Sequence, residues 1–397
     1  MTKILLAKIL KLSFLIIELY KCRDKMAKKI KVLRVITRLP IGGIERRLVA
    51  ILPRLNDDEF EVSICCLKER GELADELEKS GVKVILIPSK SRLHPRSIFA
   101  LADFMKREEI DIVHSHMYRS NVPATIAASL AGVRVNIAQI HNVDTWETQR
   151  QRLMDSFLCR WRDLIIAVSQ NVRHDILKNL SIPPEKCEVL YNGVEAKNFN
   201  KHFDKIEIKK SLGIAQDKIV ISIVARLVDQ KNHKGFLETA QLLSEEYDNL
   251  IFLIVGDGKL KDGLVKQTED LGISDKVKFL GNRDDIAEIL SITDISVLTS
   301  FKEGFSNTIV ESLASGVPVV ASDVGGNAEA VEDGKNGFII EPNTPELTAE
   351  KLSYLIEDKK LRNAMSEAAL ISSKEFSIDL MIEKTKEIYR RLYKEKV

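Results

Sequence analysis

The sequence has few cysteines, and no two of them are spaced for metal binding. The five are Cys22, Cys65, Cys66, Cys159 and Cys187. Because the count is odd and no CxxC pair occurs, the sequence indicates neither a disulfide framework nor a zinc site. This cysteine usage fits a reducing compartment.

Two nucleotide-binding signatures are missing as well. No Walker A sequence is present, and the turn with Gly256 and Gly258 has Lys261 where a Rossmann fingerprint needs its third glycine. A lone GxG after a strand is weak evidence for dinucleotide binding. The sequence therefore argues against a dehydrogenase and against a P-loop NTPase.

Long uninterrupted apolar runs are also lacking near the N-terminus. The apolar stretch 4–20 contains Lys8, Lys11 and Glu18, and it is shorter than the ~20 apolar residues that a spanning helix needs. No small-residue cleavage site follows it, as would follow the apolar run of a signal peptide. Its apolar positions lie on one helical face, which allows an interfacial helix. Alternatively, Met26 is a start site and the residues before it are upstream sequence.

Charge is nearly balanced overall but unevenly spread. The net charge is +2, yet residues 1–200 carry 33 Lys and Arg against 24 Asp and Glu, a net of +9. A basic half is compatible with phosphates, an anionic lipid carrier or a membrane surface as partner. It is equally compatible with scattered, solvated Lys and Arg side chains.

What the sequence does contain is a repeated alternation of strand and helix patterns. Its 397 residues suffice for two domains. The expected strands are 31–37, 62–67, 82–87, 110–114, 135–139 and 164–168, then 219–225, 250–255, 277–280, 295–298, 317–321 and 337–340. This alternation predicts an α/β fold with two doubly wound, parallel-sheet domains. Ligands of such folds bind at the carboxyl ends of the strands, so the cleft between the domains is the expected site.

The same pattern divides the chain into four segments. We expect an N-terminal extension at 1–27, a first domain at 28–200, a second domain at 201–375 and a C-terminal helix at 376–397. The polar stretch from 198 to 210 shows no strand signal and is interpreted as the inter-domain connection.

Two carboxylates flank a glycine-containing loop in the second half. Glu303 and Glu311 are eight positions apart, and a helix is expected to begin near Asn307 between them. The N-terminus of that helix favours an anion. Glu303 can accept hydrogen bonds from sugar hydroxyls, and Glu311, about one turn into the helix, can reach a ribose diol. Two glutamates alone mean little, because most glutamates are solvated surface residues.

The whole stretch 300–320 resembles the E-x7-E motif of retaining glycosyltransferases with the GT-B fold, in particular glycosyltransferase family 4 (glycosyl transferases group 1). The similarity extends from about residue 31 to about residue 374. The other segments that carry it are 42–46, 189–194, 225–232, 255–258, 279–281, 323–329 and 333–337.

The resemblance implies two Rossmann-like domains that face each other across a cleft, with an acceptor domain at 28–200 and a donor domain at 201–375. It implies a nucleotide-sugar donor and no obligatory metal or other cofactor, and the sequence has no Asp-x-Asp triplet that would argue otherwise. The donor-binding residues that it implies are Gly42, Gly43, Asn192, Arg226, Lys231, Gly304, Phe305, Ser306, Asn307, Thr308 and Glu311. The catalytic residues that it implies are Glu303, His141, Arg226 and Lys231.

Arg226 and Lys231 also have a physical argument. A leaving nucleoside diphosphate gains negative charge as the glycosidic bond breaks, and fixed cations stabilise that transition state. Arg binds phosphate bidentately, whereas Lys supplies a point charge. The competing interpretation is ion pairing with Asp229 or solvent exposure. Lys234 is a second candidate for the Lys role, because the family usually has Lys-Gly where Lys231 is followed by Asn232.

The histidines at strand ends are weaker candidates. His114 and His116 alternate at the end of one expected strand, so their side chains share a face. No third ligand is nearby in sequence, which argues against a metal site. His141 follows another strand end, and the resemblance suggests that it faces the donor sugar. For each of the three, a hydrogen-bonded core histidine is the alternative.

The favoured hypothesis is a retaining transferase that moves a hexose or N-acetylhexosamine from a UDP- or GDP-sugar to a glycan or lipid-linked acceptor. The resemblance and the basic first half suggest surface polysaccharide or lipopolysaccharide synthesis, at a cytoplasmic location with peripheral contact to the inner membrane surface. Nucleic acid is not an expected partner. The alternatives are a non-catalytic sugar-nucleotide-binding protein and a GT-B epimerase or phosphorylase.

Overall fold

The computed structural model describes residues 28–143, 146 and 148–397. The expected N-terminal extension, 1–27, lies outside these residues. Within the described part of the chain, no helix is both long and apolar enough to cross a membrane.

The first half of the chain forms a seven-stranded parallel sheet with the order β3-β2-β1-β4-β5-β6-β7. Its strands are β1 (Ile30–Ile36), β2 (Phe60–Cys66), β3 (Lys83–Leu86), β4 (Ile112–His116), β5 (Val135–Ile140), β6 (Leu164–Ala167) and β7 (Cys187–Val189). Its inner strands β4, β5 and β6 are buried on both faces, as a sheet covered by helices on both sides requires, whereas the edge strands β3 and β7 are partly exposed.

The second half forms a six-stranded parallel sheet with the order β10-β9-β8-β11-β12-β13. Its strands are β8 (Ile219–Val224), β9 (Leu250–Val255), β10 (Val277–Gly281), β11 (Ile295–Leu298), β12 (Val319–Ser322) and β13 (Gly337–Ile340). In each sheet the strand order reverses beside the first strand, between β1 and β4 and between β8 and β11. Doubly wound folds bind their ligands at these reversal points.

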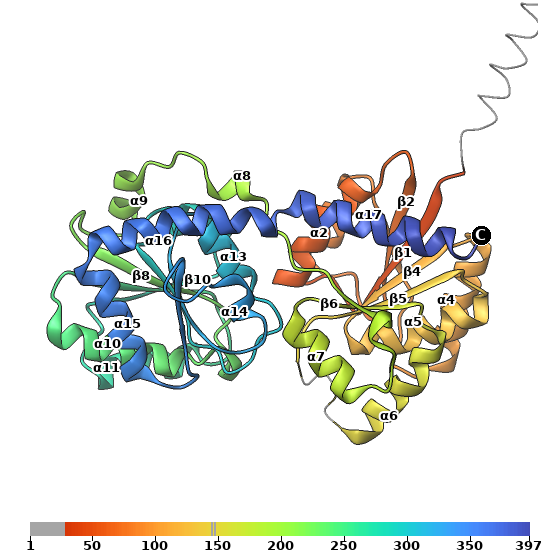
Figure 1. Ribbon diagram of the computed structural model, residues 1–397, viewed down its shortest axis with the longest axis horizontal. Helices are drawn as coiled ribbons and strands as arrows, with labels where there is room; N and C mark the ends of the chain where they lie inside the picture. Colours follow the sequence, from red (N-terminus) through yellow and green to blue (C-terminus); the bar gives the residue numbers. More distant parts are fainter. Residues whose placement is uncertain (1–27, 144–145, 147) are drawn as a thin grey trace, which may run out of the picture.

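Helices cover both sheets (Figure 1). Those of the first half are α2 (Gly43–Leu55), α3 (Ala74–Lys79), α4 (Pro95–Arg107), α5 (Tyr118–Ala131), α6 (Gln149–Leu158) and α7 (Gln170–Asn179). Those that follow are α8 (Ala196–Phe199), α9 (Lys205–Ser211), α10 (His233–Glu246), α11 (Lys261–Asp270), α12 (Ile286–Ser291), α13 (Asn307–Ala314), α14 (Asn327–Ala330), α15 (Pro345–Glu357), α16 (Lys359–Ser372) and α17 (Ile378–Lys394).

The predicted strands all occur, with ends that shift by a few residues, and the structure adds two features. The short strand β7 was not among the expected strands. The expected connection at 198–210 contains the end of α8 and most of α9. Asp204 caps α9 by accepting a hydrogen bond from the backbone N–H of Glu207 at 3.1 Å. So short and polar a helix has little apolar periodicity that a sequence pattern could reveal.

The last helix, α17, leaves the second half of the chain and packs along the first domain (Figure 1). Met381, Tyr389 and Leu392 belong to the same buried cluster as Leu52 and Phe60 of the first domain. Burial of this apolar face is the main force that holds the helix there. The hydroxyl of Tyr389 also lies 2.9 Å from Nδ1 of His114, deep in the first sheet.

Tyr389→Phe is expected to lower the stability of the first domain by about 1–3 kcal/mol, because the ring stays but a buried hydrogen-bond partner of His114 is lost. Tyr393→Phe is the matched control. Its hydroxyl accepts a hydrogen bond from Arg134 at 3.0 Å at the surface, so its loss is expected to cost less than about 1 kcal/mol. Calorimetric melting of both variants gives the comparison. Equal losses would show that the His114 contact contributes nothing specific.

Candidate active site

A cleft of about 720 Å³ lies between the two domains and is lined by residues from both. Most of the site residues expected from the sequence line it: Gly42, Gly43, His141, Asn192, Arg226, Lys231, Glu303, Gly304, Phe305, Asn307 and Thr308. Ser306 and Glu311 are not in the lining.

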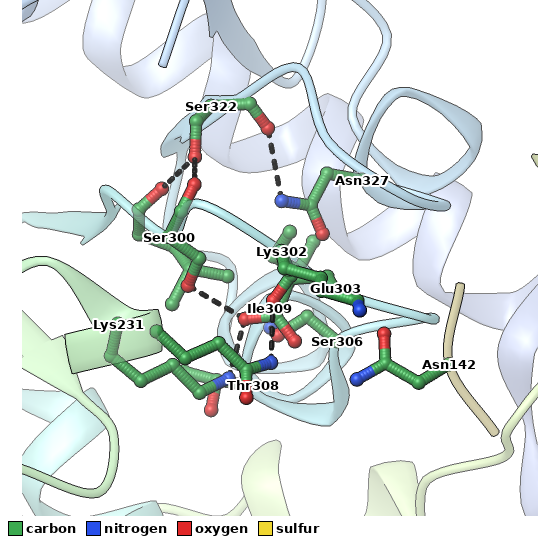
Figure 2. A network of polar contacts seen from close by, with 12 residues as sticks. Asn142, Lys231, Ser300, Lys302, Glu303, Ser306, Thr308, Ile309, Ser322 and Asn327 are labelled. Carbon is green, nitrogen blue, oxygen red and sulfur yellow. Dashed lines mark hydrogen bonds and ion pairs between the residues drawn. The ribbon is translucent and has the colours of Figure 1, made fainter. Parts of the chain in front are cut away.

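Glu303 and Lys231 form an ion pair that lines the cleft. The ammonium of Lys231 and the hydroxyl of Ser300 both contact Oε1 of Glu303, the hydroxyl at 2.7 Å (Figure 2). The side chains are largely buried, with 8% of Glu303 and 16% of Lys231 exposed. Burial makes such a pair strongly interdependent, because either charge left alone would lose its neutralising partner.

Hydrogen bonds hold the loop that carries Glu303 in place. Ser322 donates to the carbonyl of Ser300 at 2.6 Å, and Asn327 donates to the carbonyl of Ser322 at 3.0 Å (Figure 2). The amide of Gln230 donates to the carbonyl of Lys302 at 2.6 Å. These contacts fix the loop from both sides, so the Glu303 carboxylate has a defined position in the cleft.

Helix α13 starts directly after this loop, and its first residues, Asn307 and Thr308, line the cleft. The hydroxyl of Ser306 caps it by accepting from the backbone N–H of Ile309 (Figure 2). Ser306 therefore has a local role in starting the helix. The hydroxyl of Thr308 donates to the carbonyl of Val224 at 2.9 Å and so holds the helix start beside the end of β8. Backbone N–H groups at this helix terminus favour an anion.

Arg226 follows β8, is exposed and lines the same part of the cleft. The expected competing ion pair does not form, because Asp229 pairs with Lys259. Lys234 is exposed and is not part of the cleft lining. Of the two candidate lysines, the structure thus brings Lys231 to Arg226 and Glu303.

Asn307 joins the two domains at this point. Its side-chain oxygen accepts from Arg47 and from Asn192, each at 3.0 Å, and its amide donates to the carbonyl of Gly43 at 3.1 Å. The three partners all belong to the first half of the chain. Sequence reasoning missed Arg47, although a charged residue on the otherwise apolar face of the helix after Gly43 is a readable signal.

A buried chain of side chains leads to His141. Arg34 donates to Nε2 of His116 at 2.9 Å, and Nδ1 of His116 lies 3.1 Å from Nε2 of His141. Nδ1 of His141 lies 3.4 Å from Arg47. Burial, reinforced by the nearby guanidinium groups of Arg47 and Arg34, lowers the pKa of His141 well below its ordinary value. His141 is therefore a neutral hydrogen-bonding group and not a cation.

The proton count along this chain decides what His141 can offer. A neutral imidazole carries one ring proton. If His116 accepts from Arg34 and His141 accepts from Arg47, the proton of each ring lies on the nitrogen that faces the other ring. The hydrogen bond between His116 and His141 has room for only one of these two protons. The contact between Arg47 and His141 is the longest of the three, so we infer that it is not a hydrogen bond donated to His141. His141 then carries its proton on Nδ1 and can donate a hydrogen bond in the cleft.

Glu311 lies on α13 outside the cleft lining and is half-buried. Burial raises its pKa to about 7, and the charge of Arg46 acts in the opposite direction. Arg46 in turn pairs with Asp284 of the second domain. Glu311 is thus a carboxyl group that titrates near neutral pH, next to a cation of the first domain.

Among residues 28–143, 146 and 148–397, no group of three or more His, Cys, Asp or Glu side chains is placed to hold a metal ion. Charged side chains of both domains line the cleft, and Arg226, Lys231 and Glu303 are those of the second domain that the sequence predicted.

Two family profiles together match most of the chain. The profile described as Glycosyltransferase Family 4 matches residues 41–198, and that described as Glycosyl transferases group 1 matches residues 204–370. Two facing doubly wound domains with a cleft between them form the GT-B fold. The chain belongs to glycosyltransferase family 4.

Relatives are similar over nearly their whole length. UDP-Gal:alpha-D-GlcNAc-diphosphoundecaprenol alpha-1,3-galactosyltransferase of Escherichia coli is 30% identical over 381 residues, which cover 91% of this chain and 97% of the relative. N,N'-diacetylbacillosaminyl-diphospho-undecaprenol alpha-1,3-N-acetylgalactosaminyltransferase of Campylobacter jejuni is 27% identical, covering 87% and 94%. The crystal structure of Anabaena HepE in complex with UDP has a TM-score of 0.82 at 24% identity, covering 92% and 100%, and shares the fold.

Lys231→Ala is expected to reduce turnover about 100-fold or more and to destabilise the second domain by about 3 kcal/mol, because Glu303 is left buried without its cation. Lys234→Ala, three residues away and exposed, is the matched control and should change stability by less than about 0.5 kcal/mol. Arg226→Ala should reduce turnover without the loss of stability. Steady-state kinetics and melting curves measure both effects. If Lys231→Ala and Lys234→Ala behaved alike, the role given to Lys231 would be wrong.

Proposed function

We propose that this glycosyltransferase moves a hexose or N-acetylhexosamine from a nucleotide-sugar with retention of the anomeric configuration. The observation that carries the proposal is the contact between Lys231 and Glu303 in the cleft, with Arg226 and the start of α13 beside it. This arrangement offers cations and a helix terminus to a diphosphate and a carboxylate to a sugar. The donor requires both.

When the donor binds, the ammonium group of Lys231 exchanges its contact with Glu303 for one with the diphosphate. The diphosphate of a nucleotide-sugar carries two negative charges, and it competes with Glu303 for the ammonium group. Once Lys231 has turned to the phosphate, the Glu303 carboxylate accepts hydrogen bonds from sugar hydroxyls. Arg226 adds a second cation, so the charge that develops on the leaving diphosphate is stabilised most strongly in the transition state.

The acceptor hydroxyl attacks the anomeric carbon on the face from which the diphosphate departs. A bond forms between the acceptor oxygen and that carbon, the bond from the carbon to the phosphate oxygen breaks, and the hydroxyl proton passes to the departing phosphate oxygen. No separate catalytic base is needed. The pKa of His141 lies well below its ordinary value, so its ring is neutral. It contributes as a hydrogen-bond donor to the sugar.

A UDP-sugar is the first donor to test and a GDP-sugar the second. The Escherichia coli relative is named for UDP-Gal, and solved Anabaena HepE complexes contain UDP and UDP-glucose. In this chain we assign the ribose to Glu311, which is not in the cleft lining but follows Thr308 of the lining by about one turn of α13. The diphosphate is bound by Arg226 and Lys231, with Gly42 and Gly43 close to it, and we propose no metal cofactor.

For the acceptor we propose a glycan or a lipid-linked sugar used in surface polysaccharide or lipopolysaccharide synthesis. The relatives named for diphosphoundecaprenol acceptors support this class. The excess of basic residues in the first half of the chain supports an anionic acceptor. The reaction would then take place in the cytoplasm, with the protein in peripheral contact with the inner membrane surface.

The anomeric configuration of the fresh product tests the proposal directly. We expect the product to keep the configuration of the donor sugar, and proton NMR of the new linkage reports it through the anomeric coupling constant. An inverted linkage would refute the retaining mechanism. Nucleotide release that is independent of acceptor, with no glycosylated product, would instead favour a non-catalytic or hydrolytic protein.

Glu303→Gln and Glu311→Gln should have different kinetic signatures. Loss of a contact that strengthens in the transition state lowers kcat, so we expect Glu303→Gln to lower it about 100-fold. Glu311→Gln should chiefly raise the donor KM. Because the pKa of Glu311 is raised to about 7, the donor KM of the wild type should rise as pH falls through 7, when the carboxylate becomes protonated. That pH dependence should disappear in Glu311→Gln. The same signature in both variants would contradict this division of roles.

A further inference from the structure

Two arginines of the first domain line the cleft without an ion-pair partner among the described residues. Arg92 is half-buried and Arg119 is exposed at the start of α5. The guanidinium of Arg92 lies 4.8 Å from the ring centre of Tyr118, which holds it against the cleft wall. Other cations of this wall are already used, since Arg47 bonds to Asn307 and Arg38 pairs with Glu69.

These arginines lie on the domain opposite to the donor cations. Arg226 and Lys231 come from the second domain, whereas Arg92 lies in the loop before α4 and Arg119 in the first turn of α5, both in the first domain. A nucleotide-sugar has one diphosphate, and Arg226 and Lys231 bind it in the proposed function. A second, separate pair of cations in the same cleft therefore fits a second phosphate-bearing ligand.

Helix α6 packs against Tyr118, the residue that lies beside Arg92 and Arg119. The hydroxyl of Tyr118 donates to the carbonyl of Gln151 at 3.3 Å, and Gln151 lines the cleft. Tyr118 also packs in a small apolar cluster with Leu158 of α6. The residues beside Arg92 and Arg119 are thus in direct contact with α6, which lies at the outer edge of the first domain (Figure 1).

The outer face of α6 and of the turn that follows it is apolar and uncovered. Leu153, Phe157 and Trp161 are spaced four residues apart and are 61%, 52% and 43% exposed. Phe157 and Trp161 stack edge to face at 5.0 Å. Such an i, i+4, i+8 stripe is the face that an amphipathic helix normally buries, and here no other described element covers it.

The charged residues beside this stripe indicate what kind of surface it contacts. A groove of about 320 Å³ beside it is lined by Leu153, Phe157, Ile182 and Pro183 together with Arg160 and Lys186, and by no carboxylate. The guanidinium of Arg160 lies 5.1 Å from the ring centre of Phe157. Exposed Trp, Phe and Leu bordered by Arg and Lys are the composition of a surface that lies in the headgroup region of an anionic membrane.

We propose that Arg92 and Arg119 bind the diphosphate of a lipid-linked acceptor and that the α6 stripe, Leu153, Phe157 and Trp161, contacts the membrane that holds its lipid chain. The proposal rests on the proposed function, whose acceptor class it specifies. With the α6 stripe on the membrane, the diphosphate of the acceptor lipid would lie in the cleft while the hydrocarbon chain of that lipid stays in the bilayer.

The diphosphate subsite is tested with geranyl diphosphate and geraniol as soluble probes, with UDP filling the donor site. Calorimetry should show at least tenfold tighter binding of the diphosphate to the wild type, and Arg92→Gln and Arg119→Gln should each reduce that ratio about tenfold. Arg92→Lys should restore part of it, because the charge returns without the bidentate geometry. Arg107→Gln, at the far end of α4, is the control.

The membrane contact is tested with the full chain and phosphatidylcholine vesicles with or without phosphatidylglycerol. The triple variant Leu153→Ser, Phe157→Ser, Trp161→Ser should bind the anionic vesicles at least tenfold more weakly than the wild type, and Ile371→Ser, an exposed apolar residue of α16, should bind like the wild type. The tryptophan emission of the wild type should shift to the blue on binding. Trp161→Phe should abolish that shift.

Equal binding of geranyl diphosphate by the wild type and the two arginine variants, or no binding by the wild type, would overturn the subsite. Unchanged vesicle binding by the triple variant would overturn the membrane contact. Failure of both UDP and GDP to bind would count against the proposed function itself, and the calorimetric titration of nucleotide alone reports it separately.

Discussion

The whole site depends on how closely the loop around Glu303 approaches the first domain. A Cβ atom at Gly304 would lie 2.0 Å from the carbonyl oxygen of His141, so only glycine permits this contact between the two backbones. The carbonyl of Gly304 accepts from the hydroxyl of Ser169 at 2.9 Å, which adds a hydrogen bond across the same interface. Any larger residue at 304 would push His141 away from the carboxylate with which it shares the cleft.

Further contacts across the domains reinforce that approach. The carboxylate of Glu329 accepts from the first two backbone N–H groups of α7, at 2.7 and 2.8 Å, and from the hydroxyl of Tyr191 at 2.9 Å. A carboxylate at a helix N-terminus is favoured by the helix dipole. The rings of Tyr191, Phe305 and Phe376 meet beside it with centres 5.1 to 5.6 Å apart. Polar and aromatic contacts therefore set the angle between the domains together.

The sequence predicts the fold much better than it predicts the site. Buried parallel strands are continuous apolar runs such as 250–255, and their pattern is local, so every expected strand is found. The cleft is different, because its contacts join residues far apart in the chain. No local pattern could show that Lys231 would contact Glu303 or that Arg47 would contact Asn307. Ser306 illustrates the same limit, since its type and position fit both a ligand contact and the capping role that its hydroxyl has.

The return of α17 to the first domain constrains the order in which the protein can fold during synthesis. Residues 378–394 are made after both sheets, yet Met381, Tyr389 and Leu392 complete the apolar core around Phe60. The first domain is made long before the part that covers it, and until then it exposes that apolar surface to chaperones and to other chains. The first domain cannot complete its core until α17 has been made, so a stop codon before residue 378 would damage the domain that was made first.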